Sequence, residues 1–338
     1  MDTALVTGGA GFVGSSLVKR LLIEGYLVKL FDLPGSNNLA LLQAEIGEHP
    51  NLRIITGDIT RYSDVSKAVE GADLVFHTAA LLNSIAPYRT FYNVNVLGTE
   101  NLCKACLNQP IRRLVLVSTS DVFGIPSAGE TLSESSGYKP WNEPYADTKI
   151  KACETVKRYN RIHNLPTTIV YPGWVYGPGD RQFFPAVIDM VKDKHVFIWS
   201  RGQPYEVDLI YIDDLIDGIV SAALNPVAEG QDYLLLDNDT GFTPERFFRY
   251  LAQQLQVQIN VYRVPYTLLF MVASVSQWLH RKGITQSHLL STTDVKAFGN
   301  NFRFSIKKAK EQLNWAPRTR LKDGLKAAFE WQRKTLSI

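Results

Sequence analysis

The residues best suited to acid–base chemistry are a tyrosine and a lysine four positions apart. Tyr145 and Lys149 lie in a segment whose helical pattern runs to about residue 160, and this spacing places them on one face of a helix. A free tyrosine, with a pKa of about 10, is a weak base near neutral pH. A neighbouring ammonium group favours the phenolate, so we expect Lys149 to lower the pKa of Tyr145. A pair with this spacing is otherwise an ordinary surface pair.

Three consecutive hydroxyl residues offer such a site a second component. Ser118, Thr119 and Ser120 follow a strongly apolar run that predicts a buried strand. Ligands of an open parallel sheet lie at the carboxyl ends of its strands, where a hydroxyl can hydrogen-bond a reacting oxygen. Asn95 could complete a polar network behind the tyrosine, although an asparagine at a helix start more often has a structural role.

A glycine-rich stretch near the amino terminus is typical of a dinucleotide site. Residues 7–14 read Thr-Gly-Gly-Ala-Gly-Phe-Val-Gly, between a predicted strand and a predicted helix. Gly8 permits the tight turn, Gly11 lets the backbone approach a pyrophosphate, and Gly14 lets helix and strand pack closely. The N–H groups at the start of the helix would then face the phosphates.

Two acidic residues that follow predicted strands bear on which dinucleotide fits. Asp32 ends the second strand, 18 residues after Gly14, where a carboxylate accepts both ribose hydroxyls of NAD and repels a 2′-phosphate. Residues 33–38 contain no Lys or Arg to pair with such a phosphate, so we expect NAD rather than NADP. Asp58 follows the third strand and could face the adenine amino group, but a turn or helix-cap role is equally open.

Short aliphatic runs alternate with helical patterns through the first half of the chain. This alternation implies right-handed crossovers and a parallel, doubly wound α/β sheet of the Rossmann type. The predicted strands are residues 3–7, 27–32, 52–56, 74–77, 114–118 and 167–171, and residues 208–212 and 233–237 are expected to return to the same sheet.

The pattern becomes irregular after about residue 172, which predicts a second, smaller lobe. The length of 338 residues fits two such units. We expect residues 1–175, with a return segment at 205–240, to form the Rossmann domain. Residues 176–204 and 241–338 are expected to form a C-terminal substrate-binding lobe over the carboxyl ends of the strands.

Together these motifs resemble the extended short-chain dehydrogenases/reductases, which are NAD-dependent epimerases, dehydratases and dehydrogenases. The matching motifs lie at residues 7–14, 57–58, 77–80, 93–99, 118–124, 145–149 and 172–178. The resemblance implies bound NAD and a homodimer that pairs through the Tyr-Lys helix and its neighbour. It implies that Tyr145 is the acid/base, that Lys149 activates it and binds the cofactor ribose, and that Thr119, with Ser118 as the alternative, is the hydroxyl residue. Further cofactor contacts at matching positions are Gly8, Gly11, Phe12, Val13, Gly14, Asp32, Asp58, Ile59, Thr78, Ala79, Ala80, Asn95 and Pro172.

Three departures from the family pattern separate its branches. Sugar 4,6-dehydratases follow the active-site Thr with an Asp-Glu pair, whereas this chain has Ser120 and Asp121, so the first acid is missing. Nucleotide-sugar enzymes commonly carry a diphosphate-pairing Arg where this chain has Val207, and their Arg-Tyr-Phe-Asn segment is Tyr-Pro-Gly-Trp at residues 171–174. The ending resembles instead that of the 3β-hydroxysteroid and sterol dehydrogenases, at residues 264–274, 304–309 and 313–317.

These features favour an NAD-dependent oxidoreductase acting on a secondary alcohol or ketone of a largely apolar, sterol- or lipid-like small molecule. A nucleotide-sugar epimerase or dehydratase with retained NAD is the main alternative, and a redox-silent NAD sensor is another. The intact Tyr, Lys and Thr set argues against the sensor, because a pure binder needs no activated tyrosine.

The charge of the chain is uneven. Its formal net charge is +3, yet residues 281–338 hold 13 Lys and Arg against 4 Asp and Glu. The apolar run at residues 264–274 precedes this segment and is too short to span a bilayer. A basic flank beside an apolar run favours contact with a membrane surface, with a solvated face or a core helix equally open.

Other classes of function find no support. The six histidines show no metal-ligand spacing, and His77 is expected to be structural. Cys103 and Cys106 lie in a helical pattern without a thioredoxin-like context. Nothing resembles a nucleic-acid module. Three cysteines and an amino terminus without a basic leader favour a reducing cytosol.

Overall fold

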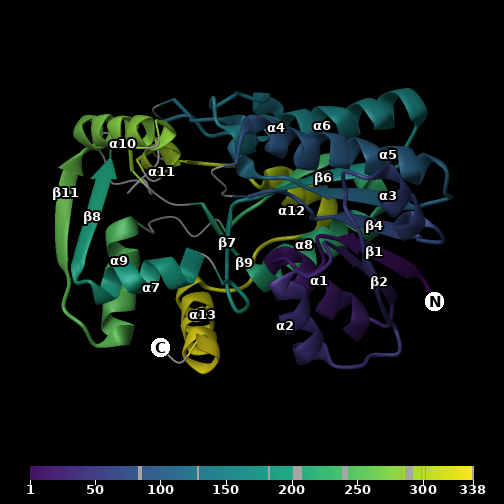
Figure 1. The fold of residues 1–338 in the computed structure, drawn as a ribbon, viewed down its shortest axis with the longest axis horizontal. Helices are drawn as coiled ribbons and strands as arrows, with labels where there is room; N and C mark the ends of the chain where they lie inside the picture. Colours follow the sequence, from purple (N-terminus) through teal and green to yellow (C-terminus); the bar gives the residue numbers. More distant parts are fainter. Residues whose placement is uncertain are drawn as a thin grey trace.

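A parallel β-sheet forms the centre of the larger part of the molecule (Figure 1). The structure, a computed structural model, describes the chain except residues 83–85, 128, 182, 201–207, 238–242, 283, 286–291, 298, 301 and 337–338. Within the described residues the sheet has seven strands in the order β10-β6-β5-β4-β1-β2-β3. These strands are Asp232–Leu235, Thr167–Pro172, Arg113–Val117, Leu74–His77, Thr3–Thr7, Leu27–Asp32 and Leu52–Thr56. The predicted doubly wound sheet is thereby confirmed.

Helices cover both faces of this sheet (Figure 1). The helix α5 packs against both α3 and α6 on one face, and α1 packs against α8 on the other. The central strands are therefore buried on both sides, which explains why β1 and β5 read as continuous apolar runs. The helices are α1 Phe12–Ile23, α2 Asn37–Ile46, α3 Tyr62–Val69, α4 Tyr88–Phe91, α5 Gly98–Leu107, α6 Pro144–His163, α8 Ile212–Leu224 and α12 Lys307–Leu313, with a π-helical turn η1 at Tyr92–Leu97.

One predicted strand of the central sheet lies elsewhere. We expected residues 208–212 to return to this sheet, but β9 (Leu209–Tyr211) pairs with β7 (Trp174–Tyr176) in a separate two-stranded sheet. The edge beside β6 is occupied by β10, so β9 has no place there. A Cβ added to Gly173 would lie 2.7 Å from the carbonyl oxygen of Asp208, so the two chain segments meet closely where the new pairing begins.

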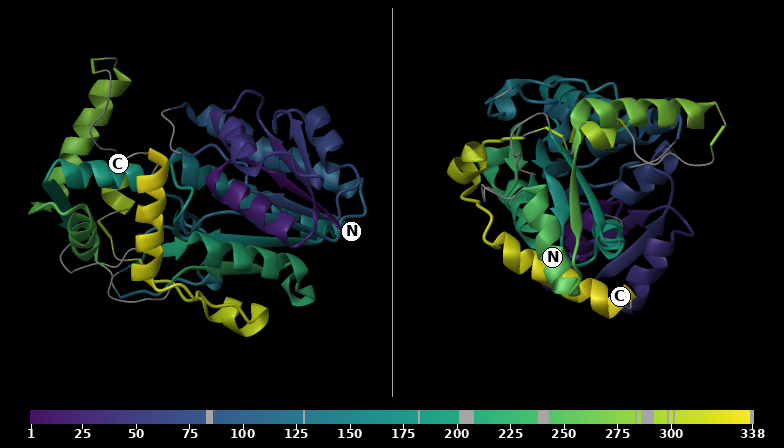
Figure 2. Two further views of the ribbon diagram at one scale, coloured as in Figure 1. Left: turned by 90° about the horizontal axis from the view of Figure 1, so that it is seen from below. Right: turned by 90° about the vertical axis from the view of Figure 1, so that its left-hand side faces the viewer.

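The smaller part of the molecule combines a two-stranded parallel sheet with helices (Figure 2). Its strands β8 and β11 pair along their whole length. A small core of Trp199, Tyr266, Ala273 and Val295 joins them to the neighbouring helices. The elements are α7 Phe183–Lys192, β8 His195–Ser200, α9 Pro244–Leu255, β11 Asn260–Pro265, α10 Tyr266–Arg281 and α11 Thr292–Ala297, and α13 Leu321–Leu336 packs against β7.

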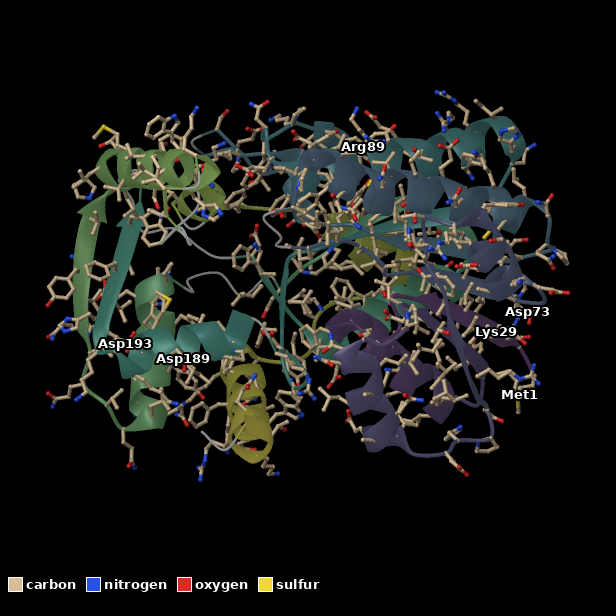
Figure 3. The ribbon with its side chains drawn as sticks, viewed as in Figure 1. Met1, Lys29, Asp73, Arg89, Asp189 and Asp193 are labelled. Carbon is tan, nitrogen blue, oxygen red and sulfur yellow. The ribbon has the colours of Figure 1, made fainter. Side chains whose placement is uncertain are left out.

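The carboxyl ends of the central strands point toward this smaller part. Figure 3 shows Met1 and Asp73, which precede β1 and β4, at the far end of the molecule. Asp189 on α7 and the neighbouring Asp193 lie at the opposite end. The residues that follow β1, β4 and β5 therefore lie between the two parts, where an open parallel sheet binds its ligands.

Candidate active site

The loop between β1 and α1 has no room for side chains at two of its glycines. Gly8 has a φ of +69°, and a Cβ there would lie 2.6 Å from the backbone of Ala79. A Cβ on Gly14 would lie 2.1 Å from the carbonyl oxygen of Gly8. Gly11 is the N-cap of α1, which has neither a side-chain cap nor an acidic residue in its first turn. The N–H groups of this helix start, at Phe12 and Val13, thus suit an anion such as a pyrophosphate.

Asp32 is fixed beside the glycine loop by two backbone donors. Its Oδ2 accepts the N–H of Ala10 at 2.8 Å, and its Oδ1 accepts the N–H of Leu33 at 2.8 Å. Each carboxylate oxygen keeps a lone pair for a further donor. This arrangement suits a pair of ribose hydroxyls.

Asp58 has the turn role, one of the two that the sequence left open for it. Its Oδ1 accepts both the N–H of Thr60 at 2.9 Å and the hydroxyl of Thr60 at 2.8 Å. The neighbouring Ile59 is buried, and a Cβ on Gly98 would lie 2.9 Å from its side chain. The local role of Asp58 is therefore a turn, which leaves its second carboxylate oxygen for other donors.

The end of β4 borders the glycine loop. Thr78 donates its hydroxyl to the carbonyl oxygen of Thr7 at 2.7 Å, and Ala79 is the residue that Gly8 approaches. Ala80 follows and is half-buried. Pro172 ends β6, three strands away from β1, opposite Leu235 of β10. The structure thus brings residues 78–80 to the glycine loop and leaves Pro172 farther along the sheet.

His77 is structural, as expected. Thr99 donates its hydroxyl to the carbonyl of Asn95 at 2.6 Å, so the contact of 2.9 Å with His77 makes Nε2–H the donor. His77 Nδ1 then accepts the hydroxyl of Thr7 at 2.7 Å. Burial, with a smaller effect of Lys149, lowers the pKa of His77 to about 3, so the ring is neutral.

Asn95 lies behind the candidate catalytic helix. It belongs to the π-helical turn η1 between α4 and α5, a type of turn that is frequent at functional sites. Its Oδ1 accepts the N–H of Leu81 at 2.7 Å, and its Nδ2 donates to the hydroxyl of Thr148 on α6 at 3.0 Å. Asn95 therefore ties the segment after β4 to α6, three residues from Tyr145.

The three hydroxyl residues after β5 point to different partners. The hydroxyl of Thr119 lies close enough to the phenol of Tyr145 to lower its pKa. Ser118 Oγ instead lies 3.0 Å from Cys153 Sγ on the inner side of α6. Ser120 is buried. The structure therefore brings Thr119, and not Ser118, to the tyrosine.

Lys149 is not among the groups that shift the pKa of Tyr145 in this structure, and its activation of Tyr145 stays a prediction. Burial and the nearby carboxylate of Asp121 raise the pKa of Tyr145, while the nearby hydroxyl of Thr119 opposes the rise. Lys149 Nζ donates to the carbonyl oxygen of Val117 at 2.8 Å, and burial lowers the pKa of Lys149 to about 8. The ammonium is thus directed at β5, one helical turn from the phenol.

Sequence reasoning treated Asp121 only as a departure from a family pattern. In the structure its backbone N–H donates to Thr119 Oγ1 at 3.2 Å, and its carboxylate lies close enough to Tyr145 to raise the pKa of that phenol. Burial raises the pKa of Asp121 itself to about 6. The signal available in the sequence was its position two residues after Thr119, within the turn that follows a buried strand.

Other predicted features lie away from these residues. Tyr171, in the segment that departs from the sugar-enzyme pattern, contacts the hydroxyl of Tyr138 at 2.6 Å and donates to Asp232 at 3.1 Å. Val207 lies outside the described residues. Cys103 and Cys106 are buried on α5. Among the described residues, no cluster of three metal-ligating side chains is found, and no helix is long and apolar enough to cross a membrane.

Residues 4–235 match the NAD dependent epimerase/dehydratase family. The chain belongs to that family. As the sequence led us to expect, this epimerase/dehydratase family member is an NAD-dependent enzyme of the extended short-chain dehydrogenase/reductase type, and NAD is its cofactor. The uncapped start of α1, the tight glycine contacts and the carboxylate of Asp32 fit that cofactor.

Curated relatives and solved structures agree with this membership. A 3-beta-hydroxysteroid dehydrogenase of Mycolicibacterium neoaurum is 31% identical over 332 residues, which cover 94% of this chain and 87% of the relative. The structure of Pal from Bacillus thuringiensis has a TM-score of 0.80 and 27% identity, and covers 98% of this chain and 99% of that one. The dTDP-glucose 4,6-dehydratase DesIV of Streptomyces venezuelae, solved with NAD, has a TM-score of 0.80 and 25% identity over 99% and 98% of the chains. The family member thus has relatives among both steroid and sugar enzymes.

Proposed function

We propose that this protein oxidises the secondary alcohol, or reduces the corresponding ketone, of a largely apolar, sterol- or lipid-like substrate. The observation that carries the proposal is the position of Thr119 at the carboxyl end of β5, where it lies close enough to the Tyr145 phenol of α6 to affect its pKa. Two hydroxyls that meet there can bind one substrate oxygen. The resemblance to steroid dehydrogenases of 31% identity supports the choice of an apolar substrate.

The two hydroxyls divide the work at the reacting oxygen. Tyr145 takes the proton of the substrate hydroxyl during oxidation and returns it to the carbonyl oxygen during reduction. Thr119 hydrogen-bonds the same oxygen and stabilises the charge that develops on it. Ser118 is held by Cys153 and takes no part.

The cofactor would be held by the loop after β1 and by α6. Gly8, Gly11 and Gly14 would admit the pyrophosphate to the start of α1, and Asp32 would bind the adenosine ribose. Lys149 would bind the nicotinamide ribose. When bound, NAD supplies the acceptor for the hydride that leaves the carbinol carbon.

The remaining cofactor contacts divide into two groups. Thr78, Ala79 and Ala80 would line the loop side, where Ala79 already meets Gly8. Asn95, Asp58 and Ile59 would contact the cofactor from η1 and from the turn that follows β3. Pro172 would lie at the nicotinamide end, close to the end of β5.

The substrate would enter between the two parts of the molecule. We propose that residues 1–175, with 205–240, form the cofactor domain, and that residues 176–204 and 241–338 form the substrate lobe. The arrangement of the strand ends toward α7 supports this division (Figure 3). A sugar dehydratase role is disfavoured because Ser120, at the position of the missing acid, has no carboxyl group.

A substrate panel tests the function. Purified protein with NAD is incubated with 3β-hydroxysteroids and, separately, with UDP- and GDP-sugars, and net NADH is followed by absorbance. The proposal expects net NADH with a steroid. Interconversion of a nucleotide-sugar without net NADH would favour the epimerase alternative. Binding of NAD with no reaction of any steroid or nucleotide-sugar would favour the sensor.

We also propose that α10 meets an anionic membrane surface. Leu268, Met271, Val272, Val275 and Trp278 form one exposed apolar stripe on this helix, which contains no acidic residue and is followed by Lys282. Figures 1 and 2 show α10 at the outer edge of the smaller part. Co-sedimentation with anionic vesicles tests this proposal. Met271→Glu should abolish binding, whereas Leu224→Glu, a change at an exposed leucine on α8, should not.

Two further expectations stay predictions. A cytosolic location follows from the cysteine content. A homodimer would pair through α6 and α5, where Ile162 and Leu107 are exposed. Light scattering in solution checks the dimer, and a monomer at micromolar concentration would contradict it.

A further inference from the structure

The segment before α6 contains a tryptophan that is bound to the turn after β5. Trp141 is buried, with 5% of its surface exposed, and its indole Nε1–H donates to the carbonyl oxygen of Asp121 at 2.6 Å. Asp121 lies in the 3-10 turn η2 (Ser120–Phe123), of which Thr119 is the N-cap, and its N–H donates to Thr119 Oγ1 at 3.2 Å. The indole therefore holds the turn that carries the proposed substrate-binding hydroxyl.

The backbone of Trp141 is bound to the start of α6. Its N–H donates to Asp147 Oδ1 at 3.0 Å, and Asp147 lies in the first turn of α6, two residues after Tyr145. Asn142, directly after Trp141, has a φ of +59°, so the backbone bends between Trp141 and the helix. One residue thus connects η2 to the helix that carries Tyr145.

The residues that lead to Trp141 pack tightly along η2. Lys139 donates its N–H to the carbonyl oxygen of Val122 at 3.0 Å. Gly124 has a φ of +72°, and a Cβ there would lie 2.6 Å from the Cβ of Lys139. This close contact leaves little room for residues 139–141 to shift along the turn.

The proposed substrate lobe contacts Trp141 from another side. Lys296 Nζ on α11 donates to the carbonyl oxygen of Trp141 at 3.0 Å, and the ring of Phe302 stacks on the indole with centroids 5.9 Å apart and planes at 3°. Val295, the residue before Lys296, belongs to the small core of that lobe, and its carbonyl oxygen accepts the indole N–H of Trp199 on β8 at 3.0 Å. The lobe core and the contact with Trp141 are therefore one residue apart on α11.

We propose that Trp141 is a positioning residue that sets the separation of Thr119 and Tyr145 and transmits the position of the substrate lobe to that pair. The inference rests on the proposed function, which assigns both residues to one substrate oxygen. A misplacement of about 1 Å between reacting groups can lower a rate on the order of 100-fold, so a link that fixes this separation acts on kcat. The contacts of Trp141 given above do not involve the glycine loop, so the affinity for NAD should not depend on it.

Two tryptophans with the same type of bond allow a controlled kinetic test. Trp141→Phe keeps a ring against Phe302 but loses the indole donor, so kcat should fall roughly 10- to 100-fold while KM for NAD changes by less than about twofold. Trp315 is the matched control, because it is also 5% exposed and donates its indole N–H to the carbonyl oxygen of Asp214 at 2.9 Å. Trp315→Phe should leave kcat within about twofold. Equal losses of kcat in the two variants would assign Trp141 a merely structural role and overturn the proposal.

Hydrogen exchange tests the transmission without any substrate. Lys296→Met removes the bond to Trp141, and the control Lys308→Met removes a lysine of α12 that is bound to Asp232 at 3.0 Å. We expect Lys296→Met to speed backbone exchange roughly threefold or more in residues 119–124 and 144–149, although the lost bond joins Lys296 to neither segment. Lys308→Met should leave both segments unchanged. Unchanged exchange in Lys296→Met, or an equal increase in Lys308→Met, overturns the proposal.

The two experiments separate this inference from the proposed function. Faster exchange in both segments of Lys296→Met, with no net NADH from any hydroxysteroid, would support the link through Trp141 and contradict the proposed function. Net NADH from a hydroxysteroid, with unchanged exchange in Lys296→Met, would support the proposed function and overturn the inference about Trp141.

Discussion

Lys149 Nζ donates a hydrogen bond to the carbonyl oxygen of Val117 at 2.8 Å. The bond joins α6 to the last residue of β5 and keeps a buried ammonium beside the candidate active site. Burial lowers the pKa of Lys149 from its ordinary 10.5 to about 8. Folding therefore favours the neutral amine, and the charged lysine destabilises the fold.

The first prediction concerns the loss of folding stability that burial of the charged Lys149 causes. Below pH 8 the amine is charged in both the folded and the unfolded chain, so this loss is complete. Between pH 8 and 10.5 the unfolded chain binds more protons, so stability rises with pH. Lys149→Met should raise the free energy of unfolding at pH 7 by on the order of 1–3 kcal/mol while abolishing activity. Urea denaturation checks it, and a variant that unfolds at lower urea contradicts it.

The second prediction concerns the phenol of Tyr145. Tyr145→Phe removes the proton donor and acceptor, so kcat should fall by about 10²- to 10⁴-fold with little change in NAD affinity. Tyr138→Phe is the matched control, because its hydroxyl contacts Tyr171 and not Thr119. Steady-state kinetics and fluorescence titration with NAD measure the two effects. Turnover retained in Tyr145→Phe would refute its role.

The third prediction separates two glycines of the cofactor loop. An added Cβ lies 2.1 Å from Gly8 O at Gly14 but 3.2 Å from it at Gly11. Gly14→Ala must move the start of α1 and should destabilise the protein by at least about 2 kcal/mol. Gly11→Ala should change stability by less than about 1 kcal/mol. Thermal unfolding of both variants checks this, and equal losses would show that the contact with Gly8 is not decisive.

The fourth prediction concerns the preference for NAD. Asp32→Asn weakens the hydrogen bonds to the ribose hydroxyls, so the affinity for NAD should fall roughly 10- to 100-fold. It also removes the charge that would repel a 2′-phosphate, so the ratio of the NAD affinity to the NADP affinity should decrease. Asp58→Asn should leave the ratio of the two affinities unchanged, because Asp58 lies at a turn closed by Thr60. Calorimetric titration with each dinucleotide measures both ratios. If Asp32→Asn left the ratio of the NAD and NADP affinities unchanged, Asp32 would not be the residue that selects NAD.

Much of the fold follows from local patterns. The apolar runs predicted β1 to β6, most clearly for the central strands β1, β4, β5 and β6, which are buried on both faces. The glycines at 8 and 14 predicted a close approach of loop and helix, which the contacts with Ala79 and Gly8 O confirm. These features depend on neighbours in the sequence or on one repeated packing rule.

Other features depend on contacts that no local pattern contains. The predicted place of residues 208–212 in the main sheet was wrong because β10, which follows β9 in the chain, occupies the edge of that sheet. The hydrogen bond from Lys149 to a carbonyl oxygen of β5 could not be predicted either, because it joins residues 32 positions apart. The position of Asp121 beside both Thr119 and Tyr145 emerged only in the structure.

The location of the basic segment at residues 281–338 could not be predicted either. The sequence showed its net charge but not which part of the fold it packs against. Lys308 on α12 pairs with Asp232 at 3.0 Å, and Trp315 donates its indole N–H to the carbonyl of Asp214 at 2.9 Å. Part of the segment is thus docked on the cofactor-binding part, away from α10 (Figure 1). The membrane proposal accordingly depends on α10 and not on the total charge.

One isotope measurement tests the central claim most directly. The protein is incubated with free NAD and a 3β-hydroxysteroid that carries deuterium on its carbinol carbon, and the released reduced cofactor is analysed by mass spectrometry. The proposed dehydrogenase predicts one deuterium in each NADH released, with no product from Tyr145→Phe. Conversion of a nucleotide-sugar with its label returned to the same carbon, and no labelled NADH from any hydroxysteroid, would contradict it.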